Sequence, residues 1–454
     1  MLQTNTVVSR LLSLVLVSCM FAVVFIGCGM DRSANGMESG QSVYKIEDTN
    51  PEGKKEITFW MKKGLVEDTN RIIVQRGKDF AAKYNVKVNV EIIPYEDLIP
   101  KWAEAIESGN TPDVSFLGYQ EVGRFYEKGA LADLSPLYKK IEEQNGAFYP
   151  ILKNAVTFQG KQYGIPFWAE TTVMYYRKDI LAAAGFNRPP QTWDEYRRVA
   201  KATTEPEKGV YGAGIGYGKS NSDAEWFTRS VLWSFGGFEV GADGKTITVD
   251  SPESVAAVRL ISNMFLVDKS TPPSSIGWDD SGNNKAYLSG EAVTVFNSGS
   301  IANKAKTDNP DLYKNTGIAP LPRGPEGRFV PGIENTLGIF ENSKNPELAQ
   351  MLVEYLMDKA WYSSWIDNSA PLLCPVYSGL EGNPIWQDPM NKPFIQSIKD
   401  FTFLGYKGDF SSAAGKVYDL RLVNDTMQDI IVSRMAPEKS MEDLQAKIEQ
   451  IYKK

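Results

Sequence analysis

Two kinds of hydrophobic period alternate along most of the chain. Apolar residues occupy every second position from Val86 to Ile92, which is the pattern of a strand with one buried face. Residues 70–84 and 98–106 instead place apolar side chains three or four positions apart, as amphipathic helices do. Short apolar runs at 57–60 and 112–117 indicate two more strands. Strand, helix and strand at this spacing predict an α/β fold with a parallel sheet and right-handed crossovers.

Helix-start signals continue the pattern in the second half. Thr192 with Glu195 forms a capping-box pattern, and Asn345 before Pro346 predicts an N-cap followed by proline in the first turn. Ser440 and Asp443 predict the start of a final helix, with Met441, Leu444 and Ile448 inside. The helix after Asn345 is expected to bury Leu348, Met351, Leu352 and Tyr355.

A glycine-rich run at 212–220 has the look of a phosphate-binding loop. Such a loop needs a glycine five positions before Gly218-Lys219-Ser220, and that position is Ala213. We therefore interpret the run as a strand-end loop in which glycines permit tight turns.

The first residues form an export signal. Arg10 precedes an uncharged apolar stretch, Leu11–Ile26, and Cys28 follows Gly27. A membrane-spanning anchor is the alternative, but the stretch is shorter than the roughly 20 residues that cross a bilayer. Residues 1–27 are thus predicted to be a signal peptide. Residues 28–53, rich in Ser, Gly, Asn, Asp and Glu, are predicted to be a flexible tether, with the folded body beginning near Lys54.

Composition excludes several classes of function. The chain has 454 residues, 42% hydrophobic and 23% charged, as a globular protein does. A net charge of −7 disfavours a nucleic-acid partner. There is no histidine, so no imidazole base, Ser-His-Asp triad or His-rich metal site is possible. No cofactor and no metal are expected.

Acidic pairs and cysteines suggest no catalytic chemistry. Asp279-Asp280 and Glu142-Glu143 are interpreted as solvated surface rather than as the two carboxylates of a glycosidase, although that activity stays a minor alternative. With Cys19 in the signal and Cys28 modified, Cys374 is left alone, so no disulfide framework is expected and Cys374 is predicted to be a buried apolar residue.

Two resemblances connect these segments to known proteins. Phe25-Ile26-Gly27-Cys28 resembles a bacterial lipoprotein processing box, which implies a lipid on Cys28 and a place on the outer face of the cell membrane or its periplasmic side. Further along, seven short segments resemble, in the same order, segments of the family 1 bacterial extracellular solute-binding proteins, the maltose-binding-protein-like family. These segments are Gly109–Val114 with Gly129–Pro136, Tyr163–Pro166, Met174–Asp179 with Pro189–Glu195, Leu288–Thr294, and Gly317–Pro322.

The second resemblance implies a two-lobed periplasmic-binding-protein fold of type II-like topology. Parallel-sheet lobes would be joined by crossing hinge strands, with the solute in the interlobe cleft. It implies a non-enzymatic monomer that delivers a carbohydrate to the permease subunits of an ABC transporter. The implied segments are 54–165 (lobe 1), 166–315 (lobe 2), 316–341 (lobe 1) and 342–454 (lobe 2 and C-terminal helices).

Aromatic and polar residues at strand ends are the candidate ligand contacts. Sugars bind through aromatic platforms and through hydrogen bonds to carboxylates and amides. Other tryptophans, Trp102, Trp193 and Trp233, fall on helical apolar faces and are predicted to be core. The candidate ligand-binding residues are Trp60, Trp168, Glu170, Asp223, Trp226, Trp278, Asp279, Asn297, Glu334 and Asn335.

Four of these candidates lie in segments that match the family, namely Glu170, Asn297, Glu334 and Asn335, of which the last two belong to a Gly-rich segment that lines the cleft in the family. Glu170 matches a cleft glutamate of the family, with a hinge salt bridge as the alternative role. The segment that begins at Asn297 carries Ile301 where the family has an aromatic platform, which argues against maltose as the ligand. Two alternatives stay open. The solute is not a sugar but, for example, a polyamine or a glycerol phosphate derivative, or the protein is an extracytoplasmic sensor.

Overall fold

The computed structural model describes residues 44–45, 54–64, 67–219 and 221–453. Residues 42–454 form one compact unit. The predicted signal peptide, Cys28 and all of the predicted tether except residues 44–45 lie outside the described residues.

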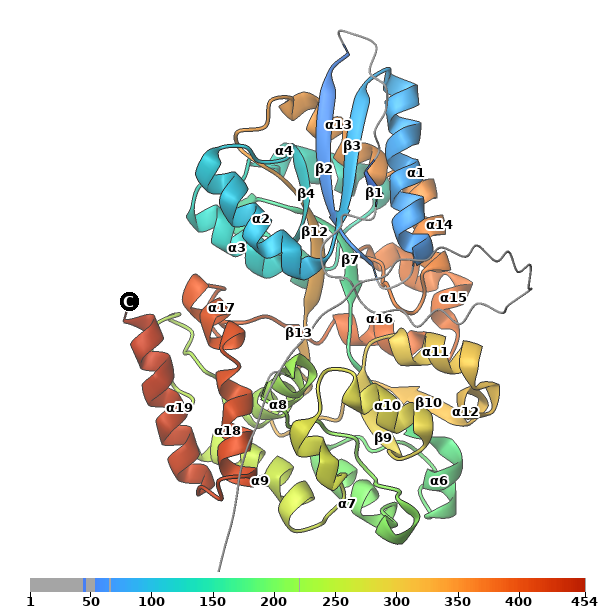
Figure 1. Cartoon of the computed structure of the whole chain (residues 1–454), viewed down its shortest axis with the longest axis vertical. Coiled ribbons are helices and arrows are strands. Elements are labelled where there is room, and N and C mark those ends of the chain that lie inside the picture. Colours follow the sequence, from blue (N-terminus) through green and yellow to red (C-terminus); the bar gives the residue numbers. More distant parts are fainter. Residues whose placement is uncertain (1–43, 46–53, 65–66, 220, 454) are drawn as a thin grey trace, which may run out of the picture. The chain divides into compact units, whose positions relative to one another are not determined.

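A six-stranded mixed sheet is the centre of the first lobe (Figure 1). β2 pairs in parallel with β3 and β4, as the βαβ pattern predicts, whereas β12 pairs antiparallel with β4 and β7. β1, within the predicted tether, pairs antiparallel with β3 at the sheet edge. In spatial order the strands are β1 (Tyr44–Lys45), β3 (Lys87–Ile93), β2 (Glu56–Lys62), β4 (Val114–Gly118), β12 (Ile333–Ile339) and β7 (Ile165–Glu170).

Helices on both sides of this sheet complete the first lobe. α1 packs on β3, α3 on β4 and β12, and α13 on β12 and α1. The helices are α1 (Glu67–Tyr84), α2 (Tyr95–Ser108), α3 (Tyr119–Glu127), α4 (Ser135–Asn145), α5 (Pro150–Ala155), α13 (Pro346–Leu356) and α14 (Lys359–Asn368); a short hairpin of β5 (Thr157–Phe158) and β6 (Lys161–Gln162) precedes β7.

The second lobe contains a three-stranded antiparallel sheet, with the order β10-β8-β9. The prediction of parallel sheets in both lobes is therefore wrong for this lobe. The reason is that β8 is the central strand of this sheet and runs opposite to both β9 and β10. The strands are β8 (Val173–Arg177), β9 (Thr294–Asn297) and β10 (Thr316–Ala319).

Most remaining helices pack around the second sheet or on one another (Figure 1). They are α6 (Lys178–Ala183), α7 (Trp193–Ala202), α8 (Ser222–Phe235), α9 (Pro252–Leu266), α10 (Gly282–Ser289), α11 (Ser300–Asp308), α12 (Pro310–Asn315), α15 (Pro384–Gln387), α16 (Lys392–Ile398), α17 (Ser412–Asp419), α18 (Leu422–Ile431) and α19 (Pro437–Tyr452), and β11 (Val330–Pro331) pairs with β13 (Phe401–Thr402).

Segment boundaries differ from the sequence-based expectation in two places. Residues from Thr316 were expected to return to the first lobe, but β10 pairs with β8 in the second sheet, and the chain re-enters the first sheet only at β12. Residues after 341 were expected in the second lobe, but α13 and α14 pack on the first lobe, where the Tyr362 hydroxyl donates to the carbonyl of Phe167 at 2.8 Å.

Helix starts agree with the capping signals only in part. Thr192 caps α7 as predicted, accepting a bond from the Glu195 amide at 3.2 Å. Asn345 stands before α13, but its side chain donates to the Glu56 carbonyl instead of capping. On α13 the predicted buried face is right for Leu348 and Leu352 and wrong for Met351, which is 38% exposed. α19 begins at Pro437, so Ser440 lies inside it and not at its cap.

Buried residues follow the core predictions. Trp102, Trp193, Trp233 and Cys374 are all buried, and Cys374 is a free thiol. Within the glycine run, a Cβ on Gly212 would lie 1.9 Å from the carbonyl oxygen of Ala200. Gly212 therefore permits close packing against α7.

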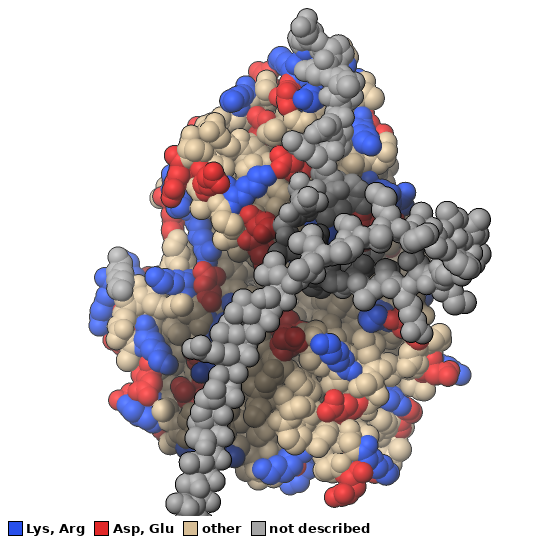
Figure 2. All heavy atoms as spheres, in the orientation of Figure 1, with Lys and Arg blue, Asp and Glu red and all other residues tan. Residues whose placement is uncertain are grey.

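Acidic and basic side chains are interspersed over the described surface in Figure 2. Among the described residues, no helix is long and apolar enough to cross a membrane, and no three acidic or cysteine side chains are grouped as metal ligands.

Candidate functional site

Two chambers lie at the carboxyl ends of the first-lobe strands, and both are lined by Lys62 at the end of β2. Open α/β sheets bind ligands at this edge, beyond the ends of their parallel strands. One chamber, here called the apolar chamber, has a volume of about 160 Å³. The other, the aromatic chamber, has about 250 Å³.

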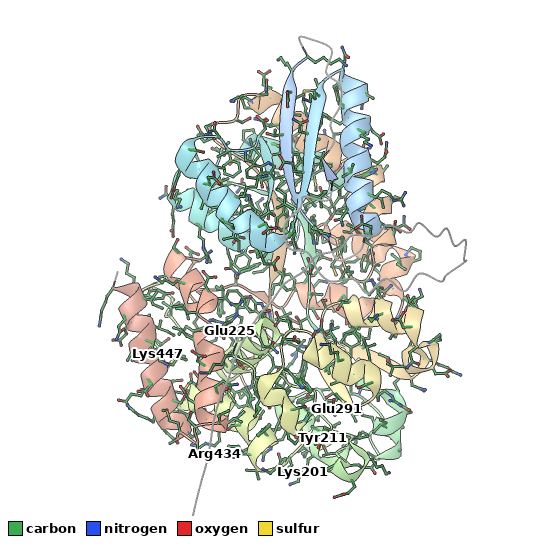
Figure 3. All side chains as sticks on the ribbon, in the orientation of Figure 1. Lys201, Tyr211, Glu225, Glu291, Arg434 and Lys447 are labelled. Atoms are coloured by element: carbon green, nitrogen blue, oxygen red, sulfur yellow. The ribbon has the colours of Figure 1, made fainter. Side chains whose placement is uncertain are left out.

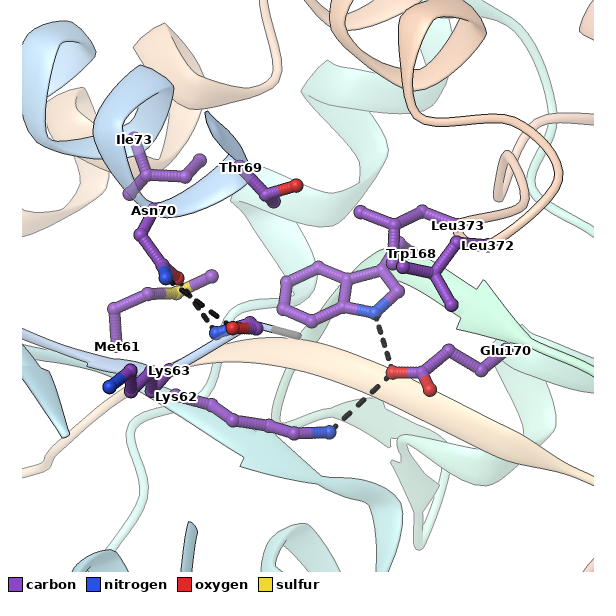
Figure 4. Close-up of a pocket in the computed structure, with 11 residues that line it drawn as sticks. Met61, Lys62, Lys63, Thr69, Asn70, Ile73, Trp168, Glu170, Leu372 and Leu373 are labelled. Atoms are coloured by element: carbon purple, nitrogen blue, oxygen red, sulfur yellow. Dashed lines mark hydrogen bonds and ion pairs between the residues drawn. The ribbon is translucent and has the colours of Figure 1, made fainter. Parts of the chain in front are cut away.

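The apolar chamber lies between β2, α1, β7 and the loop after α14 (Figure 4). The Trp168 indole forms one wall and stacks on Phe116, with ring centroids 5.5 Å apart and planes at 25°. Its lining residues are Met61, Lys62, Lys63, Gly64, Thr69, Asn70, Ile73, Trp168, Glu170, Leu372 and Leu373.

Glu170 ends the crossing strand β7 and gathers three donors on one carboxylate oxygen. Its Oε1 accepts from Trp168 Nε1 at 3.1 Å, Asn335 Nδ2 at 3.4 Å and Lys62 Nζ at 3.5 Å. The bonds from Trp168 and Lys62 are drawn in Figure 4. No described residue donates to Oε2. Glu170 therefore forms a salt bridge at the end of the crossing strand, and its second carboxylate oxygen has no hydrogen-bond donor among the described residues.

The aromatic chamber has walls from both lobes. The first lobe contributes β4, α2 and α3, and the facing wall comes from α8 and the α17–α18 junction. Its lining residues are Lys62, Tyr95, Ile99, Phe116, Gly118, Tyr119, Gln120, Glu121, Arg124, Trp226, Gly332, Ile333, Glu334, Asn335, Tyr418, Asp419 and Arg421.

Glu121 is a buried acid in the first-lobe wall. Its carboxylate accepts bonds from the Gly118 amide at 3.1 Å and from the Tyr95 hydroxyl at 3.2 Å. Burial raises the pKa of Glu121, and the nearby Arg124 opposes that rise. The same burial keeps the Tyr95 phenol protonated, since its pKa is raised as well.

The facing wall carries a stack of three side chains. The rings of Trp226 and Tyr418 lie 4.5 Å apart at 30°, and the Arg421 guanidinium lies 4.1 Å from the Tyr418 ring centre. Arg421 Nη1 also donates to the Tyr418 carbonyl at 2.6 Å. The structure therefore brings Trp226 to the wall of the aromatic chamber.

Direct bonds join α3 of the first lobe to the C-terminal segment beside this chamber. Arg124 pairs with Asp419 at 2.6 Å, and Glu127 accepts bonds from the amide and hydroxyl of Ser412. The Leu404 amide donates to the Tyr119 hydroxyl at 3.3 Å. These contacts close one end of the aromatic chamber.

Asp223 and Asn297 come together, but neither lines a chamber. Asp223 Oδ2 accepts from Asn283 Nδ2 at 3.0 Å and from Asn297 Nδ2 at 3.1 Å. Burial, reinforced by the Asp280 charge, raises the pKa of Asp223 to about 6. Since the two amides orient the carboxylate inside the second lobe, the arrangement links α8, α10 and β9.

Three candidates lie away from both chambers. Trp60 is buried inside β2, with Lys101 Nζ 4.2 Å from its ring centre. Trp278 and Asp279 line a separate hollow on the second lobe, where Trp278 Nε1 donates to Ser274 and Asp279 accepts from Ser281. The pKa of Asp279 is lowered chiefly by the Ser281 hydroxyl bond.

Glu334 and Asn335 lie on the crossing strand β12 and line the aromatic chamber. Asn335 bonds Glu170, as described above. The Glu334 side chain is buried, its Oε1 accepts from the Thr336 hydroxyl at 3.2 Å, and its Oε2 has no partner among the described residues. Burial raises the pKa of Glu334 well above its usual value.

Sequence reasoning missed several lining residues. Lys62 ends β2, so the strand-end rule that selected Trp60 would have found it too, whereas Glu121 lies in the first turn of α3. Tyr95 lies in the first turn of α2. Tyr418 and Arg421 reach the chamber from C-terminal helices, and no local sequence signal marks them.

A two-lobed α/β protein with crossing strands and a polar, aromatic cleft is a solute-binding protein. The chain belongs to the bacterial extracellular solute-binding proteins, since the model of that family matches residues 64–362. This family is non-catalytic. The chain is 25% identical over 346 residues to the diacetylchitobiose-binding protein DasA of Streptomyces coelicolor, covering 73% of this chain and 74% of that protein.

Two more comparisons agree with this assignment. The arabinooligosaccharide-binding protein of Bacillus subtilis is 27% identical over 349 residues, covering 74% of this chain and 73% of that protein. The structure of the sugar-binding protein MalE from Xanthomonas citri matches 88% of this chain and 98% of its own, with a TM-score of 0.76 and 18% identity. The last comparison bears on the fold, which is that of the periplasmic binding proteins.

Proposed function

We propose that this protein is a lipid-anchored extracytoplasmic receptor that captures a carbohydrate and delivers it to the permease of an ABC transporter. The observation that carries the proposal is the aromatic chamber, where aromatic side chains and hydrogen-bonding groups from both lobes face one volume. A sugar offers apolar C–H faces and a rim of hydroxyls, and this combination of groups suits both.

Glu170 is the proposed hydroxyl acceptor on the crossing strand. Its Oε1 is already oriented by Trp168 and Lys62, so a ligand that meets the free Oε2 encounters a fixed acceptor. Ligand contacts on α3 and on the α17–α18 junction would draw the two walls together, which is the hinge-type closure that such receptors present to a permease.

A thermal-unfolding screen of the detergent-solubilised full-length protein tests the proposal. Saccharides, polyamines and glycerol phosphate derivatives are compared at one concentration. A ligand that binds only the folded form at 100 times its Kd adds about 2.7 kcal/mol to stability. We expect saccharides to raise Tm. A rise with polyamines or glycerol phosphate derivatives alone would overturn the carbohydrate proposal, and disruption of the neighbouring permease genes tests delivery.

A further inference from the structure

Arg421 forms no ion pair with a carboxylate in the part of the chain that the structure describes. Among the described arginines that are not exposed, it alone forms no ion pair with a carboxylate. Charged groups withdrawn from water are normally paired, because losing hydration without a partner is unfavourable. The other described arginines in this class, each paired with an acid, are Arg76, Arg124, Arg177, Arg197, Arg229 and Arg328.

The backbone holds Arg421 in an unusual conformation at the chamber wall. It adopts the left-handed region, with φ of 54°, directly before α18. Non-glycine residues in this region are strained and cluster at ligand sites. Here the conformation places the guanidinium against Tyr418, which stacks on Trp226, so that the charge stands beside the aromatic surface of the chamber.

The acids near Arg421 are occupied by other partners. Glu225, shown on α8 in Figure 3, accepts from Arg229 with one oxygen and from the Asn424 amide with the other. Asp419 pairs with Arg124. On the first-lobe wall, Glu121 accepts from the Tyr95 hydroxyl and a main-chain amide. The chamber's other cations are Arg124, paired with Asp419, and Lys62, which pairs with Glu170.

We infer that the solute is an acidic saccharide whose anionic group binds the Arg421 guanidinium. This inference rests on the proposed carbohydrate-binding function and narrows its substrate class. The planar guanidinium offers paired N–H donors that match a carboxylate or a sulfate ester. The sugar ring would lie in the chamber lined by Trp226 and Tyr95, with its hydroxyls near Asn335 of the crossing strand β12.

Matched pairs of acidic and neutral sugars test the inference. The full-length protein in detergent is titrated calorimetrically with di- and trisaccharides of glucuronate, galacturonate and mannuronate, with their uncharged counterparts, and with sulfate esters of the same neutral sugars. We expect at least one acidic sugar to bind about tenfold or more tightly than its neutral counterpart. The uronate and sulfate arms identify the anionic group, and inorganic sulfate alone should bind far more weakly.

Arg434 provides a matched control for Arg421. It is an exposed arginine of the same C-terminal segment that also has positive φ, at 58°. Arg421→Gln should reduce the affinity for the acidic sugar by about tenfold or more and leave the neutral counterpart within about twofold. Arg421→Lys should recover part of the loss. Arg434→Gln should change neither affinity. Added salt should weaken acidic-sugar binding more in the wild type than in Arg421→Gln.

Three results would overturn the inference. Neutral sugars that bind as tightly as their acidic counterparts would refute it while leaving the carbohydrate function intact. Equal losses for acidic and neutral sugars in Arg421→Gln would assign Arg421 a structural role. Failure of both kinds of sugar to bind would refute the proposed function together with the inference.

Discussion

Replacing Glu170 by glutamine separates ligand binding from hinge stability. Glutamine keeps the shape and one acceptor oxygen, so Trp168 and Asn335 retain a partner, while Lys62 loses its counter-charge. A charge-assisted bond from a ligand hydroxyl is worth about 1.5–3 kcal/mol. Since a neutral acceptor remains, we expect a loss of about 1.4 kcal/mol, which is about tenfold in Kd.

Stability of the ligand-free protein should change little. The Lys62–Glu170 pair is 3.5 Å long, and its side chains are 26% and 17% exposed, so its loss should cost about 1 kcal/mol or less. Calorimetric titration with the saccharide that raises Tm most, together with urea unfolding, measures both quantities. The control is Glu143→Gln, which removes an exposed first-lobe carboxylate paired with Lys139.

Lys62→Gln, combined with Glu170→Gln in a double-mutant cycle, isolates the contribution of the pair. If affinity is unchanged in Glu170→Gln while the ligand-free protein loses more than about 2 kcal/mol, Glu170 is a hinge residue and the ligand contact is refuted.

Three further predictions concern other parts of the chain. The raised folded-state pKa of Asp223 means that the folded protein binds this proton more tightly than the unfolded chain. As the pH rises from about 4 to 6, the free energy of unfolding of the wild type should therefore fall relative to that of Asp223→Asn, by up to about 3 kcal/mol in urea unfolding. Parallel pH profiles of the two proteins would contradict this. Gly212→Ala should destabilise the fold by about 3 kcal/mol or more, because its Cβ meets the Ala200 carbonyl, whereas Gly379→Ala, in open space, should be tolerated in the same thermal assay. Mass spectrometry should find diacylglycerol on Cys28 in membrane fractions, and Cys28→Ala should release the protein; wild type in the soluble fraction would refute the anchor.

The early βαβ elements could be predicted from sequence because their periods are local. The alternating run Val86–Ile92 and the helical spacing in 70–84 correspond to β3 and α1 within a few residues. Pairing partners are non-local, and no period distinguishes parallel from antiparallel neighbours. This is why β10 was assigned to the wrong sheet and the second sheet was expected to be parallel.

Sequence reasoning selected four residues on crossing segments that the structure brings to the chambers. Trp168, Glu170, Glu334 and Asn335 line the chambers because β7 and β12 run along them. Trp60 lies away from both chambers, because a position near a strand end does not reveal which face of the sheet a side chain occupies. Arg421 could not be selected from the sequence, because the sequence does not show whether a carboxylate lies close enough to pair with it in the folded protein.

The α17–α18 junction also determines when, during synthesis of the chain, the aromatic chamber can be completed. A chain synthesised as far as Ile339 has all six strands of the first sheet, yet it lacks Tyr418 and Arg421, which form part of the facing wall. Solute can therefore stabilise the chain only after these helices have been made and packed.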